Sequence, residues 1–425
     1  MQTPRPAYWL IIIAALGYFV DIYDLVLFNV VKKESLQYIL PNADALTIKN
    51  TGIFLFNMQM LGMLIGGIFW GVWGDKRGRV SVLFGSILMY SLANVANAFV
   101  YDINLYAFVR IIAGIGLAGE LGAGITLVSE TMDKNTRGYG TMIIVTFGAL
   151  GAVLASLVAG YGAYFVSFFQ AVTGYTLMNW QVAYIVGGCL GLMLLLLRAG
   201  SLESQMFKTV QTSSHETLKR GDFTLLWKDK ATLLKYVCCI LVGLPIWFVI
   251  GILIALSEEG FAPEFGIQGV KNGTAVMYAY IGLSVGDLLS GLLSQWLKSR
   301  KKVVYLYLVF NLLLVVYYLV GLHGVSAQTY YWVCMLLGAG TGYWAIFVTI
   351  ASEQFGTNIR STVTNTVPNF VRGAVLPITS LFLIISSYIN SYAGVLLVGG
   401  ACLILAAWAT SRLGESFGKD LDYHE

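Results

Sequence analysis

Charged residues are scarce in this sequence of 425 residues: Asp, Glu, Lys and Arg make up 11% of it, against roughly a quarter in a soluble globular protein. The signature HExxH and the phosphate-binding loop are absent, so no enzymatic chemistry is predicted. The five cysteines all fall in apolar segments without a CxxC pair, which excludes a disulfide framework or a metal centre. We therefore predict no cofactor and no metal.

Long apolar segments are what the sequence has instead, because 57% of its residues are hydrophobic. Runs of about 20 apolar residues are long enough to cross a bilayer as α-helices, and β-barrel strands would be half that length. The fold class predicted is an all-α polytopic membrane protein. Its twelve spans are expected near residues 8–31, 50–73, 80–100, 104–128, 140–165, 180–198, 232–257, 273–297, 302–322, 328–350, 361–387 and 390–411.

Lys and Arg are distributed unequally between the two sides that these spans define. With the N-terminus inside, 20 of the 26 Lys and Arg residues are cytoplasmic, four are external and two lie within spans. Positive charge in short loops is retained on the cytoplasmic side, so both termini are predicted to be cytoplasmic. The basic residues are thus explained by membrane topology, and nucleic acid is not a predicted partner.

The sequence divides into two similar halves. Residues 1–198 form a first six-helix bundle, 199–231 a polar cytoplasmic linker, and 232–425 a second bundle with a short tail. Glu130 and Arg137 recur 223 residues later as Glu353 and Arg360, and the same shift carries the basic loop 75–79 onto 298–302. Two parallel repeats predict a binding site between them near the middle of the membrane.

Several segments resemble the major facilitator superfamily. GVWGDKRGRV (71–80) resembles its loop signature between helices 2 and 3, and RIIAGIG (110–116) its R-x-x-x-G-x-G motif on helix 4. GELGAGITLVSE with the following NTRG, the early GYFVDIYDLVLF and the later GYW are similar to segments of metabolite:proton symporters and sugar porters. The second loop signature, SQWLKSRKK, lacks the acidic residue. The resemblance implies two pseudo-symmetric six-helix bundles that act as a monomeric proton-coupled transporter in the cell membrane.

Six charged residues fall inside the predicted spans: Asp21, Asp24, Arg110, Glu120, Asp287 and Arg372. Each costs about 2.5–3.5 kcal/mol on insertion, so they are expected to face one another, water or substrate. Similar depths predict the pairs Asp24–Arg110 and Asp287–Arg372, at roughly 10 and 15 Å from the nearer surface. The resemblance implies that Asp24 and Arg110 couple protons to transport and that Glu120 is a proton-coupling or substrate-facing group. Asp21, one helical turn before Asp24 on nearly the same face, is predicted as a further proton-coupling group because a carboxylate without a permanent partner can titrate near neutral pH. Static ion pairs that only orient helices are the alternative.

Charges at the cytoplasmic helix ends form a second group, and a solvated surface is the ordinary explanation for them. Because their spacing repeats, we predict that they close an inner gate between the halves. The residues assigned to gating are Asp75, Lys76, Arg77, Arg79, Glu130, Arg137, Glu353 and Arg360.

A central substrate pocket is predicted from Arg372 and Asp287 together with aromatic and amide side chains, any one of which could equally serve packing. These are Tyr23, Asn57, Gln59, Trp247, Tyr343, Trp344, Asn365 and Asn369. Pro245 precedes Trp247 by two residues and is expected to loosen that helix where a gate could bend. The three histidines, His215, His323 and His424, fall in loops or the tail and are not placed to relay protons.

Together these features predict a secondary transporter that imports a small polar metabolite with protons by alternating access. Charges of both signs within the spans favour an amino acid or similar zwitterion. A mono- or dicarboxylate is the alternative substrate, and a non-transporting membrane receptor is the alternative class. The fifth span lacks the Gly-Pro signature of efflux antiporters, so import is favoured.

Overall fold

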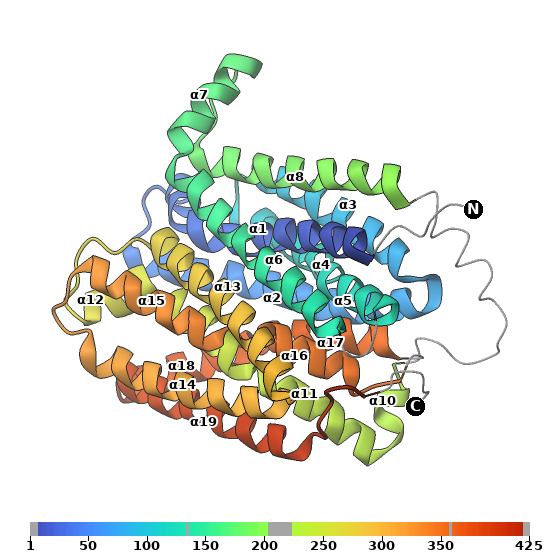
Figure 1. Ribbon diagram of the computed structural model, residues 1–425. Helices are drawn as coiled ribbons and strands as arrows, with labels where there is room; N and C mark the ends of the chain where they lie inside the picture. The colour runs from blue at the N-terminus through green and yellow to red at the C-terminus, as the bar shows by residue number, and fades with distance from the viewer. Residues whose placement is uncertain (1–6, 133–135, 203–222, 357–358, 420–425) are drawn as a thin grey trace.

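The computed structural model describes residues 7–132, 136–202, 223–356 and 359–419, and every regular element in those ranges is a helix (Figure 1). The first half contains α1 (Ala7–Ile39), α2 (Ala45–Arg77), α3 (Arg79–Asn97), α4 (Ile103–Leu117), α5 (Glu120–Thr131), α6 (Arg137–Gly160), α7 (Gly162–Thr173) and α8 (Asn179–Leu202).

The second half begins with α10 (Leu225–Lys228) and α11 (Lys230–Phe248), which continues into the π-helical turns η1 (Val249–Ile254) and η2 (Ser257–Phe261). It goes on with α12 (Ala262–Glu264), α13 (Asn272–Leu297), α14 (Arg300–Gly321), α15 (Ala327–Thr341), α16 (Trp344–Glu353), α17 (Arg360–Gly373), α18 (Val375–Tyr388) and α19 (Ser391–Arg412).

Twelve helical segments of the described chain are long and apolar enough to cross a membrane, and they confirm the twelve predicted spans. The first two are longer than predicted, since α1 continues through its polar end to Ile39 and α2 begins at Ala45. A hydropathy window ends where charge begins, whereas a helix continues as long as its backbone hydrogen bonds do.

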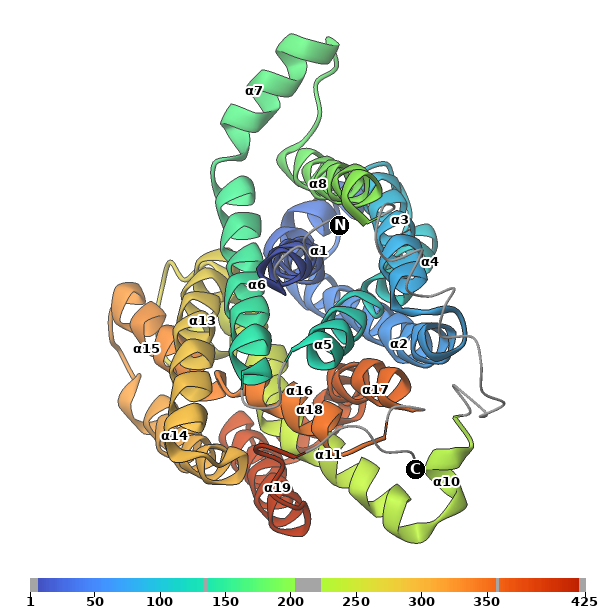
Figure 2. The ribbon, with the colours of Figure 1, turned by 45° about the vertical axis from the view of Figure 1, so that its right-hand side comes forward.

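The first six spans gather on one side of the molecule and the last six on the other (Figure 2). The two groups meet where α2 runs along α17 and where α6 runs along α13, while α1 packs on α6 within the first group. One end of the spans carries Lys76, Arg137 and Arg300 and is called the basic end below. The other end, from which α7 projects, is called the α7 end (Figure 1).

Two spans are broken at equivalent places in the two halves. The fourth span divides into α4 and α5, and the tenth divides into α15 and α16, with bounds shifted by 224 residues at both ends of the first piece and at the start of the second. The repeat inferred from the charged residues therefore extends to the backbone. Broken helices inside a membrane protein expose helix ends to the interior, where polar groups can use them.

The seventh span changes its hydrogen-bond pattern where proline had been predicted to loosen it. Pro245 lies inside α11, and the chain becomes π-helical from Val249 onward. Pro245 donates no backbone hydrogen bond and its ring crowds the preceding turn, so the regular helix is weakened near this point. The π-helical turns bring Glu258 and Glu259 to the α7 end of the span.

Candidate functional site

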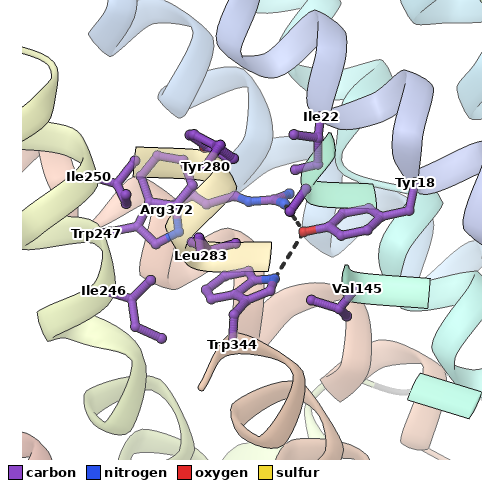
Figure 3. A pocket seen from close by; sticks show the side chains of 11 residues that line it. Tyr18, Ile22, Val145, Ile246, Trp247, Ile250, Tyr280, Leu283, Trp344 and Arg372 are labelled. Carbon is purple, nitrogen blue, oxygen red and sulfur yellow. Dashed lines mark hydrogen bonds between the residues drawn. The ribbon is translucent and has the colours of Figure 1, made fainter. Parts of the chain in front are cut away.

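A small cavity of about 20 Å³ lies between the two halves, at the place where the repeat predicted a binding site (Figure 3). This volume holds about one water molecule, so the cavity is closed to any larger ligand in this conformation. Its walls are aromatic and aliphatic apart from one charged side chain, that of Arg372. The lining residues are Tyr18, Ile22, Val145, Ala149, Ile246, Trp247, Ile250, Tyr280, Leu283, Trp344 and Arg372.

Arg372 and Tyr18 join the two halves across this cavity. The Tyr18 hydroxyl accepts hydrogen bonds from Trp344 Nε1 at 3.0 Å and from Arg372 Nη2 at 3.4 Å (Figure 3). Arg372 Nη1 donates to Asn369 Oδ1 at 3.3 Å, and its guanidinium lies 5.4 Å from the Trp344 ring centroid and 5.9 Å from that of Trp247. Its Nε has no hydrogen-bond partner among the described residues, so one donor is left for a ligand.

Asp287 does not form the predicted pair with Arg372. Its Oδ1 instead accepts the backbone N–H of Ala345 at 2.9 Å, at the first turn of α16. The positive end of a helix dipole attracts a carboxylate, and the break between α15 and α16 exposes such an end inside the protein. Depth alone could not reveal this, because it does not show that the tenth span is interrupted.

The predicted contact between Asp24 and Arg110 is also not formed in this conformation. Arg110 is fully buried, donates to Gln59 Oε1, and lies 4.7 Å from the Phe28 ring centroid. Neither carboxylate oxygen of Asp24 has a hydrogen-bond partner in the described chain. Arg110 does act on Asp24 electrostatically. The two predicted residues therefore lie in one region of the first half without direct contact.

Glu120 has a partner at the last residue of the sixth predicted span, 180–198. Arg198 of α8 is fully buried, and its guanidinium forms a two-pronged ion pair with Glu120, with Nη1 to Oε2 at 3.1 Å. Arg198 Nη2 also donates to the carbonyl of Ile13 at 3.1 Å. This pair links α1, α5 and α8 at the first turn of α5. A role for Glu120 in proton coupling must therefore include this arginine.

Gly17 makes room for that ion pair, so we expect Gly17→Ala to destabilise the protein by roughly 1–3 kcal/mol, as overpacking a buried site does. A Cβ atom there would overlap Glu120 Oε1 and Arg198 Nη2. The change in melting temperature is measured by heating the detergent-purified protein and using size-exclusion chromatography to quantify the fraction that remains folded. Gly400→Ala on α19 is the matched control because nothing lies within 4 Å of its Cβ position. Equal melting temperatures for the two variants would contradict this requirement for glycine.

Asp21 is fully buried one turn before Asp24, and neither of its oxygens has a hydrogen-bond partner in the described chain. Arg372, Glu120 and Asp24 are charged side chains that interact with it electrostatically. The two acids interact with each other, but the cation near Asp21 is Arg372 of the opposite half, whereas the cation near Asp24 is Arg110 of its own half. This difference separates two acids that the sequence had treated as one group.

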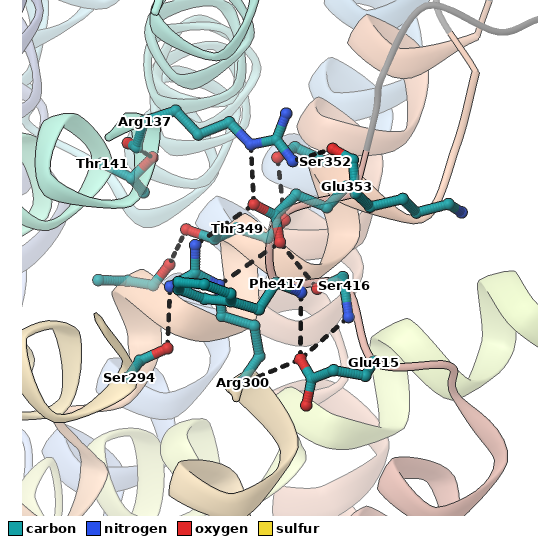
Figure 4. A network of polar contacts seen from close by, with 12 residues as sticks. Arg137, Thr141, Ser294, Arg300, Thr349, Ser352, Glu353, Glu415, Ser416 and Phe417 are labelled. Atoms are coloured by element: carbon teal, nitrogen blue, oxygen red, sulfur yellow. Dashed lines mark hydrogen bonds and ion pairs between the residues drawn. The ribbon is translucent and has the colours of Figure 1, made fainter. Parts of the chain in front are cut away.

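At the basic end, Glu353 is the centre of a network that joins the halves (Figure 4). Arg137 Nε of the first half donates to its Oε1 at 2.9 Å, and Arg300 of the second half pairs with it at 3.4 Å. Ser416 Oγ donates to Glu353 Oε2 at 2.7 Å, and Arg137 Nη2 donates to the Lys419 carbonyl at 2.7 Å. The tail after α19 is thus part of the inter-half contact.

Asp75 joins the halves at the same end by capping α17. Its carboxylate accepts the backbone N–H groups of Ser361 at 3.2 Å and Thr362 at 2.8 Å, and the Thr362 hydroxyl at 2.5 Å. In the other half Lys298 occupies the position corresponding to Asp75, and Arg300 together with Gln295 lies against Gly138 near the start of α6. The missing acid of the second signature is therefore replaced by different side chains.

The other predicted gating residues differ in their surroundings. Arg79 lies 3.6 Å from Asp75, Lys76 and Arg77 are exposed, and Arg77 stacks on Trp73 at 4.4 Å. Arg360 is buried at the first position of α17, and the side chain of Glu130 lies outside the described residues. Asp75, Arg137 and Glu353 make contacts between the halves, as the gating prediction requires.

The α7 end is closed by contacts that the sequence analysis did not predict. Lys32 of α1 lies 3.0 Å from Glu259 and donates to the Ala255 carbonyl at 3.1 Å, and Lys33 lies 2.6 Å from Glu258. Asn272 adds a bond from its Nδ2 to the Asn29 carbonyl at 2.8 Å. With both ends joined across the halves, the structure is an occluded conformation.

Removing the charge of Glu353 or of Asp75 is expected to open the basic end. A conformation is stabilised relative to another only by contacts that it alone makes. The contacts of Glu353 and Asp75 between the halves exist only while the basic end is closed, so their loss favours the open conformation. In a Cys189→Ser background, Thr349→Cys places a buried thiol on α16, one helical turn before Glu353. Labelling by a membrane-impermeant maleimide should rise severalfold in Glu353→Gln and Asp75→Asn. Glu264→Gln, an exposed acid at the other end, is the control. Unchanged labelling would assign these residues a purely structural role.

The remaining predicted pocket residues have separate positions. Trp247 and Trp344 line the cavity, whereas the hydroxyls of Tyr23 and Tyr343 donate to backbone carbonyls of their own halves, Ala183 and Val242. Gln59 is bonded to Arg110. Asn57 lines a separate small cavity near the α7 end. The Asn365 amide donates to the Ser361 carbonyl within α17, and the Asn369 amide donates to the Ala118 carbonyl of the first half.

Sequence reasoning missed Tyr18, Tyr280, Arg198, Arg300 and Lys32. Tyr18 precedes Asp21 by one helical turn, a spacing that places both on one face and was available as a signal. The three basic residues looked like loop charges, because hydropathy places them at span ends without showing that they turn inward. No group of three His, Cys, Asp or Glu residues in the described chain could hold a metal ion.

Two pseudo-symmetric helical bundles, joined at both ends by polar contacts and enclosing a cavity between them, define a membrane carrier. The chain belongs to the Major Facilitator Superfamily, whose family model matches residues 10–376. It is 25% identical over 348 residues to a niacin transporter of Acinetobacter baylyi, a match that spans 75% of this chain and 74% of that protein. It is 29% identical over 248 residues to the 3-(3-hydroxy-phenyl)propionate transporter of Escherichia coli K12, covering 58% and 56%.

A solved structure of the proton:xylose symporter XylE, bound to 6-bromo-6-deoxy-D-glucose, has the same fold. The TM-score is 0.68 with 98% of each chain covered, at 16% sequence identity. The family and fold that the sequence predicted are thus confirmed: the chain is a multi-pass membrane transporter of small molecules and not an enzyme. Members of this superfamily typically act as monomers.

Proposed function

We propose that this transporter imports a small organic carboxylate with an aromatic or apolar body, together with protons. The observation that carries the proposal is the central cavity, where Arg372 is the one charged lining residue among aromatic and aliphatic walls. Guanidinium groups bind carboxylates with charge-assisted hydrogen bonds, and Trp247 and Trp344 offer ring faces to a planar substrate. Niacin and 3-(3-hydroxyphenyl)propionate, named for two relatives, are both aromatic carboxylates.

The amino acid favoured by the sequence receives less support from the cavity. A zwitterion also needs an acidic side chain to bind its ammonium group. Asp287 already accepts a hydrogen bond from the backbone N–H of Ala345 at the start of α16, and Glu120 is paired with Arg198. Asp21 remains, since it interacts electrostatically with Arg372, and it keeps the zwitterion as the second candidate. Asp21 does not line the cavity, however, so the carboxylate is preferred.

Transport follows from opening one end at a time. The closed cavity is too small for either substrate, so loading requires the contacts of Lys32 and Lys33 at the α7 end to break while those of Glu353 and Asp75 hold. The moving units are taken to be residues 1–198 and 232–425. The concentration of Lys and Arg at the basic end supports a cytoplasmic location for that end and for both termini, in the cell membrane.

Coupling to protons is assigned to Asp21. A carboxylate that is cut off from water and hydrogen-bond donors is costly to keep ionised, and Arg372 is the cation nearby that favours its charge. A substrate carboxylate bound at Arg372 brings a second negative charge close to Asp21, which then favours uptake of a proton. Substrate and proton would thus enter together. A role for Asp24 and Arg110 in proton coupling, which the family resemblance implies, remains a prediction.

Uptake into proteoliposomes with an imposed pH gradient, measured over a panel of aromatic carboxylates and amino acids, tests this function. A monoanion that enters with one proton moves no net charge, so an imposed potential should leave its uptake unchanged. A zwitterion with one proton moves one positive charge and gains about 2.3 kcal/mol per 100 mV, roughly a 50-fold concentration ratio. Accumulation of amino acids that depends on membrane potential would contradict the carboxylate proposal. Absence of any uptake across the panel would contradict both candidates.

A further inference from the structure

The helix α7 lies apart from the transport machinery. It connects α6 to α8 at the α7 end and projects sideways, away from both bundles (Figures 1 and 2). Of its twelve residues only Gly162 is buried. Nothing in the transport cycle described above uses this helix, and its side chains cover no part of the cavity or of the contacts between halves.

The residues of α7 are divided between an apolar and a polar face. Phe165, Phe168, Phe169 and Val172 follow the spacing i, i+3, i+4 and i+7, which places them on one side of an α-helix. Phe168 and Val172 are 70% and 68% exposed. Polar residues, including Ser167 and Gln170, lie on the opposite side. A helix of this pattern is stable at a boundary between an apolar medium and water.

The whole segment from residue 138 to residue 197 contains no Asp, Glu, Lys, Arg or His, although it includes the connection between two spans. The hydroxyls of Ser167 and Thr173 donate hydrogen bonds to the backbone carbonyls of Ala163 and Phe169, each at 2.8 Å. These hydroxyls therefore do not need water as a hydrogen-bond acceptor. An aqueous protein partner that recognises charge has nothing to bind here. The chemistry of this segment fits the uncharged boundary of a bilayer.

Tyrosines mark the two ends of the helix. Tyr161, Tyr164 and Tyr175 are 60%, 77% and 73% exposed. Tyrosine is enriched where hydrocarbon meets water at a membrane surface. Leu157, on the last turns of the adjoining span α6, is also exposed, so the apolar surface of α7 continues the lipid-facing surface of the bundle.

We propose that α7 lies in the membrane interface beside the transporter. The phenylalanine face contacts lipid acyl chains, and Ser167 and Gln170 face the headgroups and water. Because the segment carries no charge, its attachment depends on apolar contact and is independent of anionic lipid. A second copy of the chain would bury the same face, and the experiment distinguishes that occupant from lipid.

Two single cysteines on opposite faces of the helix test the proposal. Phe168→Cys and Gln170→Cys are made in a Cys189→Ser background, since Cys189 is the exposed native cysteine, and are labelled with an environment-sensitive fluorophore. The full chain is reconstituted in phosphatidylcholine with brominated acyl chains. We expect the probe at 168 to be quenched at least twofold more strongly by bromolipid than the probe at 170, and aqueous iodide to show the reverse order. Both probes sit on exposed positions, which keeps folding intact.

Equal iodide quenching at both positions, without quenching by bromolipid, would place α7 in water and overturn the proposal. Protection of position 168 from both quenchers, relieved when the protein is diluted in lipid, would show that a second copy covers this face and would also overturn it. Addition of phosphatidylglycerol should leave bromolipid quenching unchanged. A severalfold dependence on that anionic lipid would contradict an attachment by apolar contact alone.

Discussion

Replacing Arg372 with methionine should reduce substrate uptake by roughly 100-fold. A charge-assisted hydrogen bond is worth about 1.5–3 kcal/mol, and each 1.4 kcal/mol is a factor of ten in affinity. Arg372 is the one charged residue that lines the central cavity, so no neighbour can take over the substrate carboxylate. Methionine approximates the length of the side chain and removes the guanidinium. Initial rates and KM in proteoliposomes with an imposed pH gradient measure the loss.

Two further variants make the result interpretable. Arg372→Lys keeps the charge but loses the planar fork and the stacking on Trp344 and Trp247, so partial activity with a raised KM is expected. Arg412→Met removes an exposed arginine at the basic end and should transport like the unmodified protein. Uptake by Arg372→Met within twofold of the unmodified rate would show that this arginine serves packing, and the proposed substrate class would fail with it.

The fold was predictable because the bilayer restricts what a chain can do. Backbone groups must be paired within each spanning segment, so twelve apolar runs can only be twelve helices. The shift of 223 residues between Glu130–Arg137 and Glu353–Arg360 was enough to reveal two repeats. The breaks that separate α4 from α5 and α15 from α16 were not predicted. An interrupted helix with no proline at the break has nearly the same hydropathy as a continuous one.

The sequence was sufficient to identify the charged residues of the candidate site, but not to identify the residues that each of them contacts. The intramembrane charges were identified from their cost of burial, yet both pairs inferred from depth are absent here. Depth is one coordinate, and a contact also requires the rotation of each helix and the direction of each side chain. Asp287 faces a helix end that the sequence did not show, and Glu120 faces Arg198, which resembled a loop residue. Tyr18 was overlooked because a single aromatic residue in a span usually serves packing.

Asp21→Asn should abolish accumulation while leaving exchange of substrate across the membrane intact. A pH gradient of one unit supplies about 1.36 kcal/mol per proton, a tenfold accumulation at equilibrium. The variant cannot bind that proton, so its internal substrate concentration should only equal the external one. Counterflow needs no net proton movement and should continue, because Arg372 still holds the substrate. Radiolabel uptake with and without preloaded substrate separates the two activities.

Proton uptake on substrate binding gives a direct test of which acid is coupled. When substrate is added to purified protein in weakly buffered detergent solution, a pH-sensitive dye should report about one proton taken up by the unmodified chain, and none by Asp21→Asn. Asp24→Asn is the matched comparison on the same helix: it removes an equally buried acid that also acts on Asp21 but whose nearby cation is Arg110 rather than Arg372. Proton uptake should therefore persist there. Loss of uptake in Asp24→Asn with retention in Asp21→Asn would move the coupling site to Asp24 and Arg110, as the family resemblance implies, and would disconnect it from the substrate arginine.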